Sequence, residues 1–218
     1  MKGKAIRLAM ALSAAFTVAS GPLLASHASA SDVRHADPNL PPLPAKFSLM
    51  VSALQPDGTT SLGRYLGPLG TVSIYAWSGG IAYNNDGTFK AELKWRAEVL
   101  GGERDQQDYP VYWVRLVNDF NGNCLEINGD PTEPGRRVWQ AACESGKKQV
   151  WILHEKPVWQ PGSLHRLFEI SSDILGKDKL RCLDADYFTR MEVYQYVTTQ
   201  ECKGNEEQKW YLVSKVLP

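Results

Sequence analysis

Few residues of this 218-residue chain stand in a pattern that could carry out catalysis. The sequence contains no Gly-x-Ser-x-Gly elbow, no His-Glu-x-x-His zinc motif and no phosphate-binding Walker loop. Asp184 and Asp186 could be read as an acid pair, but glycoside hydrolysis needs two carboxyls that converge across a cleft. Two acids so close in sequence do not predict that convergence. The residues therefore favour a protein that is not an enzyme, and we expect no cofactor and no metal.

A repeated array holds the other polar side chains of interest. Each copy runs from a Cys-Leu-acid triplet, through a strand-like run that ends in cysteine, to Gln-x-Trp. The two copies are Cys124-Leu125-Glu126 with Cys143 and Gln149-Val150-Trp151, and Cys182-Leu183-Asp184 with Cys202 and Gln208-Lys209-Trp210. The second cysteine precedes the tryptophan by 8 positions in both copies, and the two tryptophans are 59 positions apart. A fixed period with a fixed internal pattern indicates repeated supersecondary units that share one core.

A weaker first copy ends at Trp95, which lies 56 positions before Trp151. An apolar run follows Trp95, as it follows the two later tryptophans. This copy would begin near Phe47, and it has lost both cysteines and the glutamine. We therefore predict three repeats, of which the first is divergent.

The four cysteines allow three pairings, and the repeat favours Cys124–Cys143 and Cys182–Cys202. Each bridge would close a loop of about 20 residues, worth roughly 3 kcal/mol in the chain-entropy account. A metal site is the competing interpretation. It is disfavoured because no Cys-x-x-Cys pair occurs and the nearby histidines are not at ligand spacing.

Residues 1–30 have the pattern of a secretory signal peptide. Three basic residues precede an apolar run over residues 8–18, and Ala28-Ser29-Ala30 supplies a small-residue cleavage site. The apolar run is too short to span a bilayer. We therefore predict a secreted protein without a membrane span. Residues 31–46, with four prolines, are predicted to be an extended linker.

Removal of residues 1–30 would leave 21 of the 24 basic residues against 24 acidic ones, a net charge near −3. This balance gives no basic footprint for nucleic acid.

From Phe47 onward, short apolar runs are separated by turn residues. Runs at residues 47–51, 72–77, 111–117 and 167–170 predict strands, and no window shows a sustained helical period. Short and regularly spaced runs favour an all-β barrel or sandwich.

Taken in order, these motifs resemble the ricin-type β-trefoil, or R-type lectin, over residues 47–218. The resemblance implies an all-β fold, a β-trefoil of three lobes with pseudo-threefold symmetry. It also implies that Trp95, Trp151 and Trp210 are core residues and that the glutamine of Gln-x-Trp braces nearby backbone.

In sugar-binding lobes of this family, an acid and amides hold the hydroxyls of a galactose-like sugar that stacks on an aromatic ring. Carboxylates and amides suit vicinal hydroxyls because each can make two hydrogen bonds. In the third lobe, Gln200 stands where the family often has the aromatic residue, and Glu207 stands where it usually has asparagine. The resemblance gives six candidate sugar-binding residues: Asp184, Gln200, Glu207, Gln208, Tyr187 and Tyr196.

The second lobe retains less of the site. Its corresponding residues are Glu126, Trp139, Lys148 and Gln149, and the aromatic position holds Ala141. We expect Trp139 on the opposite face of its strand, since a shift of one strand position turns a side chain over. No site motif can be placed in the first lobe. At most one lobe, the third, is expected to keep a partial sugar pocket.

Two functions stay open at this point. The first is a secreted carbohydrate-binding protein. The alternative is a non-enzymatic protein–protein interaction module, similar to the receptor-binding ricin-like subunits of cytolethal distending toxins, with degenerate sugar sites. A partner-binding patch would form if several of the tryptophans outside the repeat positions were exposed together. These are Trp77, Trp113, Trp139 and Trp159.

Overall fold

The computed structural model describes nine stretches of the chain: residues 36–51, 63–70, 73–78, 82, 84–86, 88–157, 166–173, 180–185 and 194–214. Within them, the side chains of residues 77, 78, 194 and 195 are not described. The chain divides into two compact units, residues 1–31 and 32–218, and every described residue belongs to the second.

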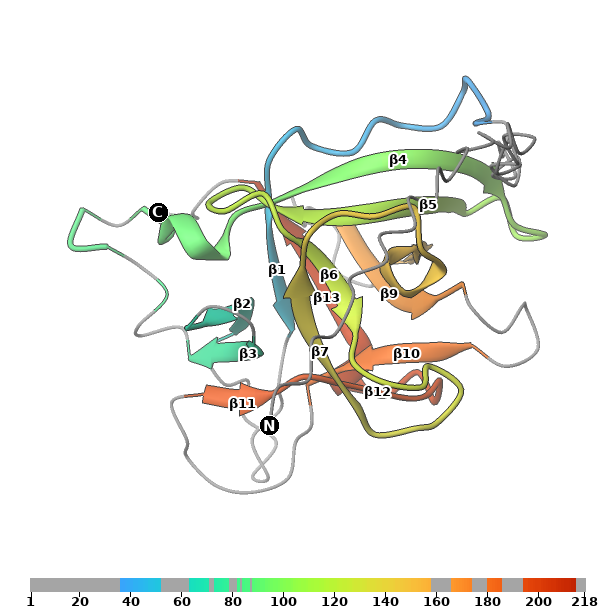
Figure 1. Cartoon of the computed structure of the whole chain (residues 1–218). Helices are drawn as coiled ribbons and strands as arrows, with labels where there is room; N and C mark the ends of the chain where they lie inside the picture. The colour runs from blue at the N-terminus through green and yellow to red at the C-terminus, as the bar shows by residue number, and fades with distance from the viewer. Residues whose placement is uncertain are drawn as a thin grey trace, which may run out of the picture. The chain divides into compact units, whose positions relative to one another are not determined.

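The described residues form a single antiparallel sheet of thirteen strands (Figure 1). The strands are β1 (Ser48–Val51), β2 (Arg64–Leu69), β3 (Ser73–Ser78), β4 (Trp95–Arg104), β5 (Pro110–Asn118), β6 (Cys124–Ile127), β7 (Arg136–Ala141), β8 (Trp151–Lys156), β9 (Arg166–Ser172), β10 (Arg181–Asp184), β11 (Tyr194–Tyr196), β12 (Thr198–Glu201) and β13 (Lys209–Val213). One-turn 3₁₀ helices η2 (Ala91–Leu93), η3 (Lys147–Gln149) and η5 (Glu206–Gln208) directly precede or adjoin β4, β8 and β13. The four strand-like runs of the sequence thus correspond to β1, β3, β5 and β9.

Six of these strands close into a barrel. β13 pairs with β1 and β9, β8 pairs with β9 and β5, and β5 pairs with β4. A bridge between Phe47 and Trp95 joins the start of β1 to β4 and completes the ring. Closure matters because an open sheet would leave edge strands with unpaired backbone groups.

Three hairpins continue from the barrel: β2–β3, β6–β7 and β10–β12. The second strands of these hairpins pair with one another. β7 pairs with both β3 and β12, and β11, which precedes β12, pairs with β3. Each lobe thus supplies two barrel strands and one hairpin, and the corresponding strand of the third lobe is split into β11 and β12. This arrangement confirms the predicted β-trefoil.

Each lobe buries one tryptophan at the start of its last barrel strand. Trp95, Trp151 and Trp210 have no exposed surface. Their indole Nε1–H groups donate to the carbonyl oxygens of Leu66, Leu125 and Leu183, at 2.9, 3.0 and 2.9 Å respectively. An indole N–H needs a partner when buried, and all three lobes supply the same one. This equivalence aligns Tyr65-Leu66-Gly67 of the first lobe with the Cys-Leu-acid triplets of the other two.

Both predicted disulfides are confirmed. Cys124 is bonded to Cys143, and Cys182 to Cys202, with sequence separations of 19 and 20. Glu169 lies close to the second pair, and these three residues form the one metal-like cluster among the described residues. Because both sulfurs are in a disulfide, they offer no thiolate to a metal.

Residues 36–46, called the strap below, pack against the barrel although they form no regular element. Leu40 and Leu43 lie against the main core. Gly102 of β4 allows this approach, since a Cβ there would come within 2.4 Å of Leu40 Cδ1. The predicted linker is therefore docked along these eleven residues.

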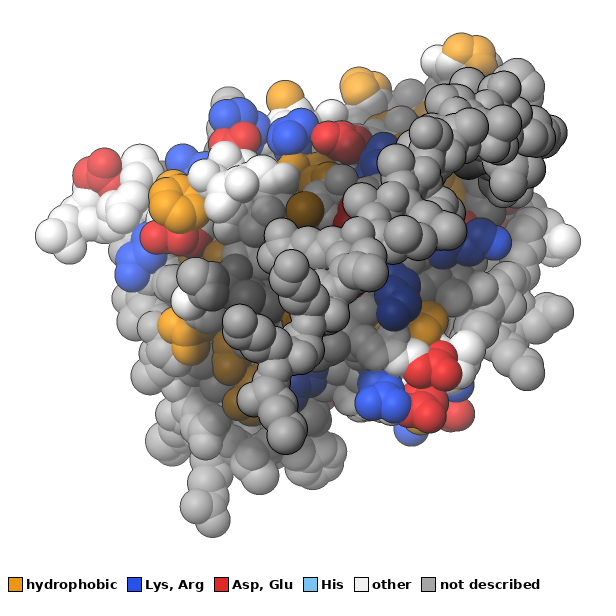
Figure 2. Space-filling model, viewed as in Figure 1, with side chains coloured by type: hydrophobic (Ala, Val, Ile, Leu, Met, Phe, Trp, Pro, Cys, Tyr) orange, Lys and Arg blue, Asp and Glu red, His pale blue; other side chains and the backbone are white. Residues whose placement is uncertain are grey.

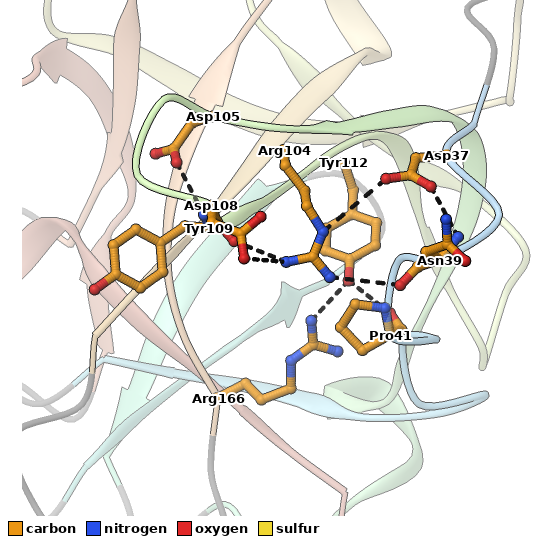
Figure 3. Close-up of polar contacts among 9 residues, drawn as sticks. All are labelled: Asp37, Asn39, Pro41, Arg104, Asp105, Asp108, Tyr109, Tyr112 and Arg166. Carbon is orange, nitrogen blue, oxygen red and sulfur yellow. Dashed lines mark hydrogen bonds and ion pairs between the residues drawn. The ribbon is translucent and has the colours of Figure 1, made fainter.

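Three polar side chains of the barrel hold the backbone of the strap: Tyr112, Arg166 and Arg104, whose Nη2 donates to the carbonyl of Asn39 at 3.5 Å (Figure 3). The Tyr112 hydroxyl donates to the carbonyl of Pro41 at 2.5 Å and accepts from Arg166 Nη2 at 2.8 Å. Arg166 also donates to the carbonyl of Pro42 at 3.1 Å and to both carboxylate oxygens of Glu155, at 3.0 and 2.6 Å. The Glu155 carboxylate and the Tyr112 hydroxyl keep the pKa of Arg166 above its ordinary value despite its burial.

Among the described residues, no helix has the length and apolar character needed to cross a membrane. On the face shown in Figure 2, basic and acidic side chains lie side by side, in keeping with the balanced charge of the sequence.

Candidate functional site

The third lobe places a buried carboxylate at the end of β10. Asp184 is 7% exposed, and its Oδ2 accepts a hydrogen bond from Gln208 Nε2 at 2.9 Å. The same Nε2 donates to the carbonyl of Glu201 at 2.8 Å, while Gln208 Oε1 accepts from the backbone N–H groups of Lys203 and Gly204. The glutamine therefore ties the acid to the end of β12 and to the turn that follows it.

The neighbouring strand β12 adds two polar side chains to this carboxylate. Thr198 stands directly opposite Asp184, and Gln200 stands opposite Cys182, so both project from the face of the sheet that carries Asp184. Gln200 Nε2 donates to Thr198 Oγ1 at 3.2 Å. The result is a short polar row of carboxylate, hydroxyl and amide.

The sequence motifs do not include Thr198. The alternation of side chains along a strand could have identified it, since Thr198 lies two positions before Gln200 and therefore on the same face.

The remaining third-lobe candidates are Glu207, Tyr187 and Tyr196. The backbone carbonyl of Glu207 accepts from the N–H of Ala185 at 3.1 Å, and this is the contact that links it to β10. Tyr187 lies outside the described residues. Tyr196 pairs with Tyr75 of the first lobe and not with any residue of β10. The structure thus brings Asp184, Gln200 and Gln208 together with Thr198, and it places Tyr196 between lobes.

In the second lobe, the acid is fully engaged by its own lobe. Glu126 Oε2 accepts from Gln149 Nε2 at 2.6 Å, and its Oε1 accepts from Trp139 Nε1 at 3.1 Å. Gln149 also donates to the carbonyl of Ala142 and accepts from the N–H of Glu144, as Gln208 does at the equivalent positions. Each oxygen of the Glu126 carboxylate thus already accepts one hydrogen bond from its own lobe.

The expectation for Trp139 was wrong. Trp139 lies directly opposite Glu126 in the sheet, and its indole reaches the carboxylate. It is two positions from Ala141, not one, and two positions on a strand share a face. Lys148 is exposed in η3.

The alignment through the tryptophans also places the first-lobe site that the motifs could not locate. Gly67 stands in the place of the acid, and Leu93 stands in the place of the glutamine. A Cβ on Gly67 would lie 2.2 Å from Leu93 Cδ2, so the leucine fills the space above the glycine. Leu93 packs there with Tyr65 and Phe89 in a small apolar cluster. The first lobe has replaced the polar pair with an apolar contact.

Of the tryptophans outside the repeat positions, Trp113 is buried and Trp139 is half-buried. Trp159 and the side chain of Trp77 lie outside the description. The described pair therefore does not form an exposed tryptophan patch.

A six-stranded barrel with three hairpins and three equivalent buried tryptophans defines a β-trefoil. A family model described as the ricin-type beta-trefoil lectin domain matches residues 112–216. These residues cover the second and third lobes, so the sequence of these two lobes matches the ricin-type β-trefoil lectin model.

Solved structures agree with the fold. The chain matches the exo-β-1,3-galactanase 1,3Gal43A of Clostridium thermocellum with a TM-score of 0.53 and 17% identity, over 80% of this chain and 31% of that chain. It matches the Rhizoctonia solani agglutinin with a TM-score of 0.50 and 15% identity, over 81% and 99% of the two chains. A further match is the cytolethal distending toxin of Actinobacillus actinomycetemcomitans, with a TM-score of 0.46 and 19% identity, over 78% and 93%.

The chain spans about a third of the length of the galactanase. No curated protein matches the chain in sequence.

Proposed function

We propose that this protein is a carbohydrate-binding β-trefoil that holds one galactose-like sugar, in the third lobe, at Asp184. The observation that supports this proposal is the contrast between the lobes. Asp184 is backed by Gln208 and is flanked by the hydroxyl of Thr198 and the amide of Gln200. Glu126 is instead capped by an indole of its own lobe, and the first lobe has glycine in place of an acid.

The polar row suits a sugar because it alternates groups that accept and donate. Vicinal hydroxyls present paired donors and acceptors, and a carboxylate next to an amide can satisfy both. The site is small and has one acid, so we expect shallow binding in the millimolar range, a free energy of about 4 kcal/mol.

Binding of lactose to the purified full chain, followed by titration calorimetry or NMR, tests this proposal. Asp184→Asn should abolish binding while leaving the fold intact, because the asparagine oxygen still accepts from Gln208. Glu126→Gln, the matched change in the second lobe, should leave binding unchanged. A folded protein that binds no sugar of a broad glycan panel would refute the proposal.

A protein–protein interaction function is the second candidate. It is favoured by the loss of site residues in two lobes of three, as described for Gly67 and Glu126. Under this alternative, the protein would act without sugar and without catalysis.

We further propose that residues 1–30 direct export and are then removed. Two disulfides are typical of proteins in oxidising compartments, which supports this assignment. Protein recovered from the medium should then begin at Ser31.

A further inference from the structure

The three hairpins meet at the pseudo-threefold axis, where each lobe contributes corresponding residues. Counting from the aligned triplets, Ser73, Arg137 and Tyr196 hold equivalent places on β3, β7 and β11. Each pairs with a residue of the next lobe: Ser73 with Trp139, Arg137 with Thr198, and Tyr196 with Tyr75. The residues at this junction therefore come from all three lobes, unlike those of a single lobe site.

Two tyrosines and one arginine gather at this junction. The rings of Tyr75 and Tyr196 lie 4.8 Å apart between centroids. The guanidinium carbon of Arg137 lies 3.7 Å above the centroid of the Tyr196 ring. Tyr196 is 41% exposed, and Arg137 is exposed as well. The hydrogen bond between the two tyrosines, with partial burial, raises the pKa of Tyr75.

Arg137 has no ion pair with any carboxylate of the described residues, whereas Arg96, Arg104, Arg115, Arg136 and Arg166 each have at least one. A guanidinium stacked on a ring keeps its N–H donors in its own plane, where they point outward and match the two oxygens of a carboxylate. Stacking also fixes the side chain in advance, so less conformational entropy is lost when an anion binds.

Beside the cation of Arg137, the rings of Tyr75 and Tyr196 supply the aromatic part of a binding surface. Tyrosine offers a rigid apolar face with a polar rim at low entropic cost. Trp139 adds half-buried aromatic surface next to Ser73, and its N–H is already used by Glu126. A ligand here would meet aromatic surface and one cation together.

We propose that this junction is a second binding site, specific for a saccharide that carries a carboxylate. The sugar ring would lie beside the Tyr75–Tyr196 pair, against the ring surface that Arg137 leaves uncovered, and its carboxylate would pair with Arg137. A single cation held on one aromatic ring suits one carboxylate better than a run of phosphates, which needs several basic groups.

Methyl β-D-glucuronide and methyl β-D-glucoside form a matched pair of probes, since they differ only in the carboxylate. The full chain should bind the glucuronide at least about tenfold more tightly than the glucoside, and the preference should weaken with added salt. Arg137→Gln should remove this preference, and Tyr196→Ala should weaken binding of both probes. Both changes lie at exposed positions, so the fold should survive.

Two control variants distinguish binding at this junction from general charge attraction and from binding in the third lobe. Arg96→Gln removes an exposed arginine on β4 and should leave the glucuronide preference intact. Asp184→Asn should weaken lactose binding in the third lobe but keep the glucuronide preference, because Arg137, which pairs with Thr198 at the border of that site, is unchanged. Equal affinity for the two probes, no binding of either, or a preference that survives Arg137→Gln would overturn the proposal.

Discussion

At the scale of single residues, Gln208 uses every hydrogen-bonding position of its side chain within its own lobe. Its two N–H donors go to Asp184 and to the carbonyl of Glu201, and its oxygen accepts from Lys203 and Gly204. The glutamine is thus a brace, as the family resemblance implies. It orients Asp184, and it has no hydrogen-bonding position left with which to bind a ligand.

Replacing Gln208 with leucine, the residue found at the equivalent place in the first lobe, should destabilise the protein by about 2–4 kcal/mol. The change removes one partner of a buried carboxylate and of several backbone groups, and a buried polar group that loses its partner costs about 1–3 kcal/mol. The double change Asp184→Gly and Gln208→Leu recreates the Gly67–Leu93 pair and should cost less than the sum of the two single changes. Urea unfolding of the four proteins measures the coupling.

Gln200→Leu serves as the control, because Gln200 is half-exposed and bonds only to Thr198 among the described residues. Its cost should stay below about 1 kcal/mol. Strictly additive single and double variants would contradict the view that acid and glutamine act as one unit.

The sequence motifs indicate these residues where the interacting side chains belong to the same lobe. Asp184 and Gln208, which Cys-Leu-Asp and Gln-x-Trp indicated, are in contact in the structure, because the cysteine and the tryptophan fix their register. Gly67 and Leu93 could not be found, since an apolar contact leaves no polar signature in the sequence. Tyr196 was assigned to the third-lobe site, but its actual neighbour Tyr75 is set by pairing between lobes, which one repeat cannot reveal.

At the scale of elements, the strap extends the domain beyond its first strand. Its prolines predict an extended backbone, and residues 36–46 form no helix or strand, although the Leu40 N–H donates to the Asp37 carbonyl in a turn. What binds it is remote in sequence: Tyr112 and Arg166 lie on β5 and β9. Composition alone therefore indicated a linker, whereas long-range contacts make this segment part of the fold.

Tyr112→Phe should destabilise the protein by about 1–2 kcal/mol at neutral pH, because the Pro41 carbonyl and Arg166 each lose a partner. Burial raises the pKa of Tyr112 above its ordinary value of 10.0. The folded state therefore holds this proton more tightly than the unfolded chain, and stability should fall as the pH rises above about 10. The variant should lose less stability over that range. Tyr75 and Tyr211, whose pKa values are also raised, should preserve part of the slope.

Unfolding measured at about pH 8 and about pH 10.5 separates the two effects. Tyr109→Phe is the matched control, since its hydroxyl points away from the cluster in Figure 3 and makes no hydrogen bond with the described residues. If Tyr109→Phe changed stability as much as Tyr112→Phe, the strap contact would not be the cause.

At the scale of the whole molecule, three lobes of different sequence keep one internal geometry. The strongest expression of this symmetry is the set of indole-to-leucine hydrogen bonds, which agree to within 0.1 Å, at 2.9, 3.0 and 2.9 Å. The ordered motifs and the family resemblance that they carry predicted the fold, and the tryptophan spacing extended the prediction to the lobe without cysteines. The split of one strand into β11 and β12 was not predictable, because it depends on pairing with β3 of another lobe.

The changes Trp95→Phe, Trp151→Phe and Trp210→Phe should have similar costs, about 2–4 kcal/mol each, since each deletes buried ring volume and leaves a leucine carbonyl unpaired. Thermal unfolding of the three variants tests this equivalence. The first-lobe variant is the informative case. A cost for Trp95→Phe near zero would show that the divergent lobe no longer depends on its tryptophan.

The pairing of Ser48 with Val213 also governs the order in which the molecule can assemble. β1 is the first of the described strands to be synthesised, and its barrel partner β13 is the last of them. Until β13 leaves the ribosome, the apolar side chains of Leu49 and Val51 cannot pack into the completed core, and the six-stranded barrel cannot close. Pairing over so long a sequence separation is intrinsically slow. Folding of this domain is therefore completed only after nearly all of it has been synthesised, which leaves time for an unfolded chain to be moved before its barrel forms.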